Sequence, residues 1–93
     1  MRFQTTETFD KLFVRLSKII QMKAAKKTDL FKKNPFHPSL RVEKLRPKKF
    51  NVWSFRVDRD YRIIFKFVER DLVEFIFIGH HNEIYDYSFR RNF

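Results

Sequence analysis

Side chains that can transfer protons or bind phosphate gather near the end of the chain. Residues 79–85 read Gly-His-His-Asn-Glu-Ile-Tyr and directly follow an apolar run. Histidine suits general acid–base chemistry, and both His80 and His81 lie in this segment. Tyr85, four residues after His81, would share its face if the segment turns helically. The alternative is that these are exposed polar side chains at a strand end, with no chemical role.

Two arginines lie on neighbouring strands of a predicted hairpin. Arg62 stands between Tyr61 and Ile63, an unusual place for a guanidinium in an otherwise apolar strand, and Arg56 precedes the turn. Fixed guanidinium donors can bind a phosphate and stabilise charge that develops on it. The alternative is that this second face of the sheet is simply solvated.

Several kinds of active site are excluded by residue types. The single glycine rules out glycine-rich phosphate loops, and the absence of cysteine rules out disulfides and thiolate ligands. A metal site would have to use His37, His80 and His81. Because adjacent residues of an extended chain point to opposite faces, His80 and His81 should make a poor pair of ligands. We therefore expect neither a metal nor another cofactor.

Charge is distributed unevenly along the chain. The formal net charge is +10, and residues 1–50 carry 14 basic and 4 acidic side chains, so the excess lies entirely in this part. Such a density indicates a face that binds a polyanion, although a solvated basic surface would have the same composition. No apolar run approaches the ~20 residues of a membrane span, and the first residues lack a signal-peptide core. We expect a cytoplasmic protein that does not bind membranes.

The elements that would position these residues can be read from hydrophobic periodicity. Residues 2–7 favour a strand, and a following helix is predicted by one apolar stripe at helical spacing. The stripe consists of Phe9, Leu12, Phe13, Leu16, Ile19 and Ile20. A more polar second helix is predicted over residues 22–33 and must end before Pro35.

From residue 40 onward the apolar period changes to two. Alternation predicts strands at 40–44, 53–57 and 63–67, and the run at 72–78 is apolar on both faces, which indicates a central strand. Helices first and strands afterwards favour one α+β domain over residues 1–93. We expect two N-terminal helices packed on one face of a mostly antiparallel sheet of four to five strands.

Three segments resemble a known family. They are residues 53–57 (WSFRV), 60–65 (DYRIIF) and 78–85 (IGHHNEIY). Their order and spacing resemble the toxins of the RelE/ParE superfamily, in particular the RelE/YafQ/YoeB group of mRNA interferases from type II toxin–antitoxin systems. The resemblance covers essentially the whole chain and implies a RelE-like fold. It also implies that Arg62 matches a phosphate-binding arginine, His81 the C-terminal histidine and Tyr85 the terminal aromatic residue.

The function implied by this resemblance is metal-independent cleavage of messenger RNA, usually on the ribosome, with neutralisation by a cognate antitoxin. The catalytic group would comprise His81, Tyr85, Arg62 and Arg56. The general base stays open, with Glu43 and His37 as candidates. Basic and histidine side chains around this group are expected to hold the RNA, namely Lys44, Arg46, Lys48, Lys49 and His80.

Two other functions fit part of the same pattern. The ParE branch of the superfamily inhibits DNA gyrase and lacks the nuclease residues, so the presence of His81 and Tyr85 argues against it. A catalytically inactive RNA-binding module would need only the basic charge.

Overall fold

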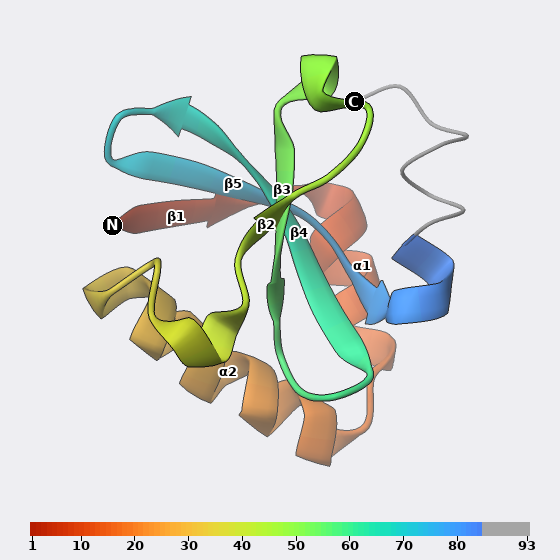
Figure 1. The fold of residues 1–93 in the computed structure, drawn as a ribbon. Coiled ribbons are helices and arrows are strands. Elements are labelled where there is room, and N and C mark those ends of the chain that lie inside the picture. Colours follow the sequence, from red (N-terminus) through yellow and green to blue (C-terminus); the bar gives the residue numbers. More distant parts are fainter. Residues whose placement is uncertain (85–93) are drawn as a thin grey trace.

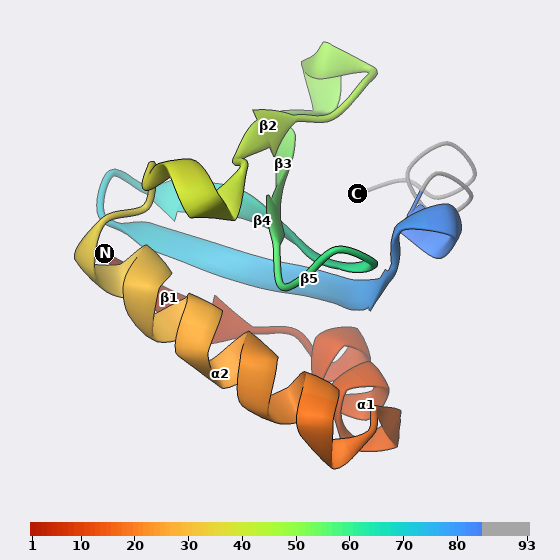
Figure 2. The same ribbon diagram turned by 60° about the horizontal axis from the view of Figure 1, so that its bottom comes forward.

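The computed structural model describes residues 1–84, which form a five-stranded sheet with two helices on one face (Figures 1 and 2). The strand order is β1-β5-β4-β3-β2; β1 pairs with β5 in parallel, and the other neighbours are antiparallel. The predicted α+β architecture is therefore confirmed. The elements are β1 (Arg2–Thr5), α1 (Glu7–Arg15), α2 (Lys18–Lys33), β2 (Glu43–Lys44), β3 (Val52–Arg56), β4 (Tyr61–Glu69) and β5 (Leu72–His80).

The boundary between the two helices differs from the prediction. The apolar stripe suggested one helix through Ile20, but α1 ends at Arg15 and α2 already begins at Lys18. Leu16 and Ser17 are extended, with ψ angles of 154° and 155°. The hydroxyl of Ser17 accepts a hydrogen bond from the amide of Ile20, so it caps a new helix. The stripe thus combines residues of two successive helices, and Ile19, which belongs to it, is 66% exposed.

The main core lies between the helices and the sheet. Its centre is Phe31 of α2, which is fully buried and stacks on Phe55 with ring centroids 4.9 Å apart. Phe65 and Phe75 meet the same ring edge-on at 5.0 and 5.9 Å. Within the predicted stripe, Phe9 is buried, whereas Leu12, Phe13, Leu16 and Ile20 are only half-buried. The second helix therefore contributes more to the core than its polar composition indicated.

The predicted strand at 40–44 is mostly not a strand. Pro38–Leu40 forms a 3₁₀ turn, Arg41 takes a left-handed conformation with φ 48°, and only Glu43–Lys44 pairs with β3. Leu40 is fully buried at the end of the turn, which explains its apolar character without a strand. A second 3₁₀ turn, Lys48–Phe50, precedes β3.

A smaller apolar cluster covers part of the opposite face of the sheet. Val52, Ile64, Phe77 and Ile84 are buried there, with Leu45 and Phe50 packed against them. Residues 81–84 form a helical turn directly after β5. This cluster holds both the segment after β2 and the helical turn against the sheet, and the polar residues described next lie beside it.

Candidate functional site

A small polar cavity lies on the sheet face opposite the helices. Its volume is about 80 Å³, and it is lined by Glu43, Leu45, Ser54, Arg62, His81 and Ile84. The lining comes from β2 and the residue that follows it, from β3 and β4, and from the helical turn after β5. The structure thus brings Arg62 and His81, two members of the predicted catalytic group, to one concave surface. Tyr85, another member of that group, lies outside the described residues.

Strand register explains why these side chains meet. Glu43 pairs with Ser54 across β2 and β3, Arg56 pairs with Arg62 across β3 and β4, and Arg62 pairs with Gly79 across β4 and β5. Directly paired residues project from the same face of a sheet. The apolar alternation of β3 and β4 fills the helix side, so the residues in between form this second face.

Arg62 is held by the turn that joins β3 and β4. Its Nη1 donates hydrogen bonds to the carbonyls of Asp58, Tyr61 and Arg59, at 2.8, 3.0 and 3.2 Å. The half-buried guanidinium is therefore fixed before any ligand arrives. Pre-positioned donors stabilise developing charge most effectively because they need little reorganisation.

The carboxylate of Asp58 stabilises the same turn. Its Oδ1 accepts hydrogen bonds from the amides of Asp60 and Tyr61 at 2.9 and 2.8 Å, and Oδ2 lies 3.4 Å from Nζ of Lys23 in α2. Burial raises the pKa of the Asp58 carboxyl, but the two amides and Lys23 outweigh it and hold that pKa below its ordinary value. A charged carboxylate thus links the turn to the helix layer.

The side chain of Arg56 carries a buried hydrogen-bond donor. Its Nε is buried and has no hydrogen-bond partner among the residues that the structure describes. A buried donor left unpaired costs about 1–3 kcal/mol, and Arg56 pairs with Arg62 across β3 and β4. An anionic ligand beside Arg56 would satisfy this donor.

His81 is anchored by its backbone and leaves part of its ring unpartnered. Its amide donates to the carbonyl of Asp60 at 2.7 Å. Its Nδ1 is buried and, within residues 1–84, has no hydrogen-bond partner. An imidazole beside a fixed guanidinium, with an unused ring nitrogen, is suited to exchange a proton with a bound phosphate ester.

The expected opposite orientation of His80 and His81 is wrong. Their rings stack with centroids 4.5 Å apart and an interplanar angle of 29°. The reason is that β5 ends at His80 and the helical turn begins at His81, so the two-residue alternation of a strand no longer applies. Nδ1 of His80 accepts a hydrogen bond from the amide of Asn82 at 3.2 Å and so caps the turn.

The glycine before the two histidines allows a close approach. A Cβ atom at Gly79 would lie 2.8 Å from the Phe77 ring and 3.1 Å from the carboxylate of Glu83. Contacts this short are not sustained by ordinary side chains, so the strand end can follow its path only with glycine here. This single glycine therefore serves the placement of His81 rather than a phosphate loop.

The other predicted residues divide into two groups. Glu43 lines the cavity, whereas the ring of His37 accepts the amide of Ser39 at 3.1 Å and caps the first 3₁₀ turn. Lys44 and Lys49 lie over the rings of Trp53 and Phe50, at 5.7 and 5.3 Å from the centroids. The exposed basic residues of β2 and the segment that follows it are Lys44, Arg46, Lys48 and Lys49.

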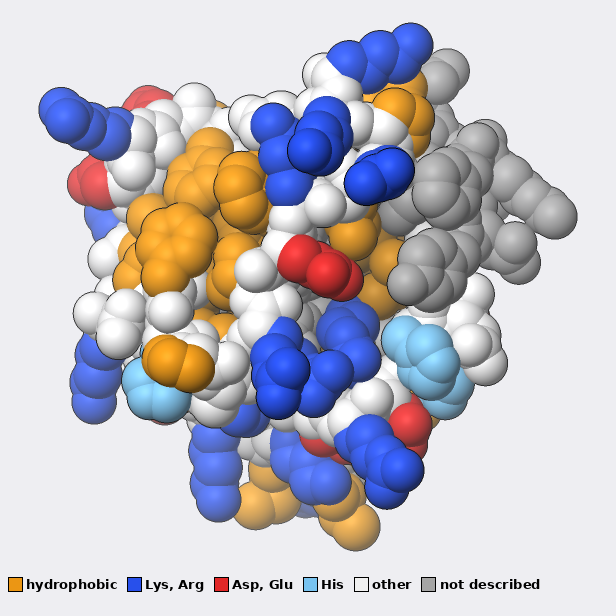
Figure 3. All heavy atoms as spheres, in the orientation of Figure 1, with side chains coloured by type: hydrophobic (Ala, Val, Ile, Leu, Met, Phe, Trp, Pro, Cys, Tyr) orange, Lys and Arg blue, Asp and Glu red, His pale blue; other side chains and the backbone are white. Residues whose placement is uncertain are grey.

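The distribution of charge on the surface agrees with this arrangement. In the orientation of Figure 1, Lys and Arg side chains surround an acidic side chain near the centre of the molecule, and histidine side chains lie on both sides, at the lower left and at the right (Figure 3).

The polar cavity residue that was not predicted from the sequence is Ser54, which is 2% exposed. A serine in an apolar, alternating strand was the available signal.

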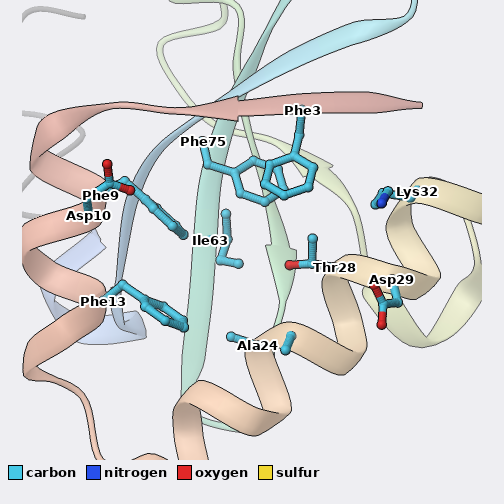
Figure 4. A pocket seen from close by; sticks show the side chains of 11 residues that line it. Phe3, Phe9, Asp10, Phe13, Ala24, Thr28, Asp29, Lys32, Ile63 and Phe75 are labelled. Atoms are coloured by element: carbon cyan, nitrogen blue, oxygen red, sulfur yellow. The ribbon is translucent and has the colours of Figure 1, made fainter.

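A second cavity lies on the helix side and has a different character. Its volume is about 390 Å³, and the rings of Phe3, Phe9, Phe13 and Phe75 surround it between α1 and α2 (Figure 4). This mainly apolar lining suits a hydrophobic group better than a phosphodiester.

Within residues 1–84, no helix is long and apolar enough to cross a membrane.

Comparison with known proteins decides the family. Residues 2–81 match the family described as RelE-like toxin of type II toxin-antitoxin system HigB. The chain belongs to this family of RelE-like toxins. The match includes the sheet, both helices and His81, and it confirms the superfamily expected from the three sequence segments. A search of curated protein sequences found no match.

Solved structures share the RelE-like fold. A YoeB/ParE toxin from Agrobacterium tumefaciens has a TM-score of 0.70 at 19% identity, covering 87% of this chain and 99% of that one. The RelB-RelE antitoxin-toxin complex from Methanococcus jannaschii gives 0.69 at 22%, with coverage of 94% and 98%. YafQ from E. coli strain BL21(DE3) gives 0.68 at 19%, with coverage of 91% and 99%. At these identities the likeness concerns the fold alone.

Proposed function

We propose that this RelE-like toxin is an mRNA endoribonuclease that works without a metal ion, cleaves messenger RNA on the ribosome and is neutralised by a cognate antitoxin. The observation that carries the proposal is the convergence of Arg62 and His81 on one polar cavity, beside Arg56. The fixed guanidinium of Arg62, the guanidinium of Arg56 and an imidazole supply phosphate binding and proton transfer, which are the two requirements of this chemistry.

The reaction is an in-line transesterification. The 2′-oxygen of a ribose forms a bond to the adjacent phosphorus, while the bond from phosphorus to the 5′-oxygen breaks. A base takes the proton of the 2′-hydroxyl, and an acid gives a proton to the departing 5′-oxygen. The products are a 2′,3′-cyclic phosphate and a free 5′-hydroxyl, so no water or cofactor is consumed in this step.

Each residue of the site receives a role in this proposal. His81 is the general acid, and Arg62 with Arg56 stabilises the negative charge on the phosphorane. Of the two candidates for the general base, Glu43 lines the cavity, while the ring of His37 is engaged with Ser39. We therefore assign the base to Glu43. Tyr85 is proposed to orient the phosphate or assist protonation.

Electrostatic binding would bring the substrate to this cavity. Among the basic residues of β2 and the following segment, Lys49 lies over the ring of Phe50, which packs against the smaller apolar cluster, whereas Lys44 lies over Trp53, which packs against the main core. Lysine and arginine side chains bind the RNA backbone without regard to sequence. Lys44, Arg46, Lys48 and Lys49, with His80 at the other edge, are proposed to hold the strand.

An antitoxin is the expected protein partner. The similar structures include antitoxin-toxin complexes, RelB-RelE from Methanococcus jannaschii and DinJ-YafQ from E. coli. The net charge of +10 favours an acidic partner that covers the basic face.

The alternative is inhibition of DNA gyrase, since the fold is shared with a protein described as a YoeB/ParE toxin. Brief expression in cells, followed by mapping of messenger RNA 5′ ends, separates the two functions. New 5′-hydroxyl ends soon after induction support the nuclease. Growth arrest without new ends, together with loss of supercoiling by purified gyrase, would show that the alternative holds.

A further inference from the structure

We propose that Asp60, His80 and His81 form a binding site for a divalent transition-metal ion, with Zn²⁺ as the best fit. One donor atom of each side chain lies within 4.8 Å of the other two. The carboxylate is exposed and both imidazoles are half-buried, so an ion can reach the cluster from solvent. This metal site overlaps the proposed cleavage site at His81 but is not part of the proposed cleavage chemistry.

The cluster is assembled by backbone contacts that do not depend on the metal. Tyr61 pairs with His80 across β4 and β5, which places the neighbouring Asp60 at the end of the same ladder. The carbonyl of Asp60 accepts the amide of His81 at 2.7 Å, and its own amide donates to Asp58. All three ligand side chains are thus carried by backbone that is already fixed.

The positions of the side chains are also partly set. The ring of Tyr61 meets that of His80 edge-on at 5.8 Å, and the His81 ring stacks on that of His80 at 4.5 Å. The buried Nδ1 of His81 has no partner among residues 1–84. An unsatisfied ring nitrogen within a histidine pair is a feature that metal coordination would explain.

The donor set points to zinc. Two imidazole nitrogens and one carboxylate oxygen, with a fourth position left to water, form a known type of Zn²⁺ site. Bond lengths of roughly 2.0–2.2 Å would draw the donors to about 3.3 Å from one another. Rotation of the exposed Asp60 side chain and small ring movements are sufficient for this. Binding through Nδ1 of His80 would exchange its 3.2 Å contact with the Asn82 amide for a metal bond, whereas binding through Nε2 would keep that contact.

Metal binding would have a direct consequence for activity. A coordinated His81 cannot exchange a proton with RNA, so zinc should inhibit cleavage rather than support it. This consequence rests on the proposed function, whereas the binding itself does not.

Calorimetric titration of the full chain with ZnCl₂ tests the site. We expect one ion per chain, and we expect Asp60→Asn to weaken binding at least ~10-fold, since even the groups that only orient metal ligands contribute this much. The backbone of this variant keeps both hydrogen bonds that Asp60 makes through its amide and carbonyl, so the fold should persist, as circular dichroism will show. His37→Ala is the matched control, because it removes the histidine outside the cluster and should leave the affinity unchanged.

Nuclear magnetic resonance of ¹⁵N-labelled imidazoles identifies the ligands. Zinc should shift the ring signals of His80 and His81 and leave those of His37 in place. Equal affinity of the Asp60→Asn protein and the unchanged chain, or a shift confined to His37, would overturn the site.

A second measurement separates this inference from the proposed nuclease. Zinc should inhibit RNA cleavage by the unchanged toxin, a chelator should restore it, and Asp60→Asn should require at least ~10-fold more zinc for the same inhibition. If neither protein cleaves RNA, the proposed function fails while calorimetry still decides the metal site. If both cleave RNA but calorimetry finds no zinc bound, only the metal site fails.

Discussion

The amide of His81 donates a 2.7 Å hydrogen bond to the carbonyl of Asp60, so the turn between β3 and β4 holds the start of the helical turn after β5. The contact is between backbone atoms alone. The position of residue 81 is therefore independent of its side chain, which makes substitution there a clean test of chemistry.

His81→Ala should abolish growth arrest and lower RNA cleavage by ~10²–10⁴, the usual contribution of one proton-transfer group. Because the backbone bond to Asp60 remains, we expect the free energy of unfolding and the affinity for the antitoxin to change little. Cleavage of ribosome-bound messenger RNA, calorimetry with the antitoxin and thermal unfolding provide the three measurements. A toxic His81→Ala protein that produces no RNA ends would exclude the nuclease assignment.

The two arginines should respond differently to substitution. Arg62→Ala removes three hydrogen bonds to turn carbonyls, so both cleavage and stability should fall. Arg56→Gln removes an Nε that has no partner in the described residues, so cleavage should fall ~10²–10³ while stability is kept or rises slightly. Single-turnover rates and urea unfolding separate these effects. Equal loss of stability in both variants would show that Arg56 has a structural role.

Phe31 should be the most sensitive position of the core. Its ring is fully buried and contacts Phe55, Phe65 and Phe75. Phe31→Ala should lower the free energy of unfolding by about 3–5 kcal/mol. Leu16→Ala, at a half-buried position, should have a smaller effect. Val14→Ala is the control, since Val14 is 72% exposed and should change stability by less than ~0.5 kcal/mol. Urea denaturation measures all three.

RNA binding should weaken steeply as salt rises. If six or more phosphates are engaged, affinity should fall by ~10³ or more between roughly 50 and 200 mM salt. Each of Lys48→Gln and Lys49→Gln should reduce the slope of log affinity against log salt by about one if that lysine contacts a phosphate. Fluorescence anisotropy with the His81→Ala protein avoids cleavage. Lys11→Gln is a suitable control, because Lys11 lies on α1, in the helix layer.

The strands at the centre of the sheet could be predicted because the apolar residues that alternate along their sequence are also the residues that lie buried in the structure. Phe55 and Phe65 belong to the core on the helix side, and the arginines between them had to occupy the other face. The break at Leu16 and Ser17 could not be seen, because two helices in succession present apolar residues at nearly the same spacing as one. Leu40 was predicted to lie in a strand because a buried leucine at the end of a 3₁₀ turn fits the same apolar alternation as a strand residue.

The site was partly predictable for the same reason. Paired positions on β3 and β4 follow from the hairpin, so Arg56 and Arg62 could be placed together. The stacking of His80 on His81 depends on where β5 ends, and no local pattern in the sequence marks that point. Asp60 lies beside the two histidines because its carbonyl accepts a hydrogen bond from the amide of His81, about twenty residues later in the sequence. Only the folded chain reveals this contact.

The parallel pairing of β1 with β5 also has a consequence for synthesis. Arg2 pairs with Leu72, and Thr5 with Phe75, so the first strand has no partner until the fifth has been made. Contacts across such a separation slow folding, because a long loop must close before they form. A nascent chain whose β5 has not yet emerged from the ribosome cannot complete the sheet, and the cavity residue His81 directly follows β5. The cavity residues of β2, β3 and β4 can therefore meet His81 only after β5 has joined the sheet.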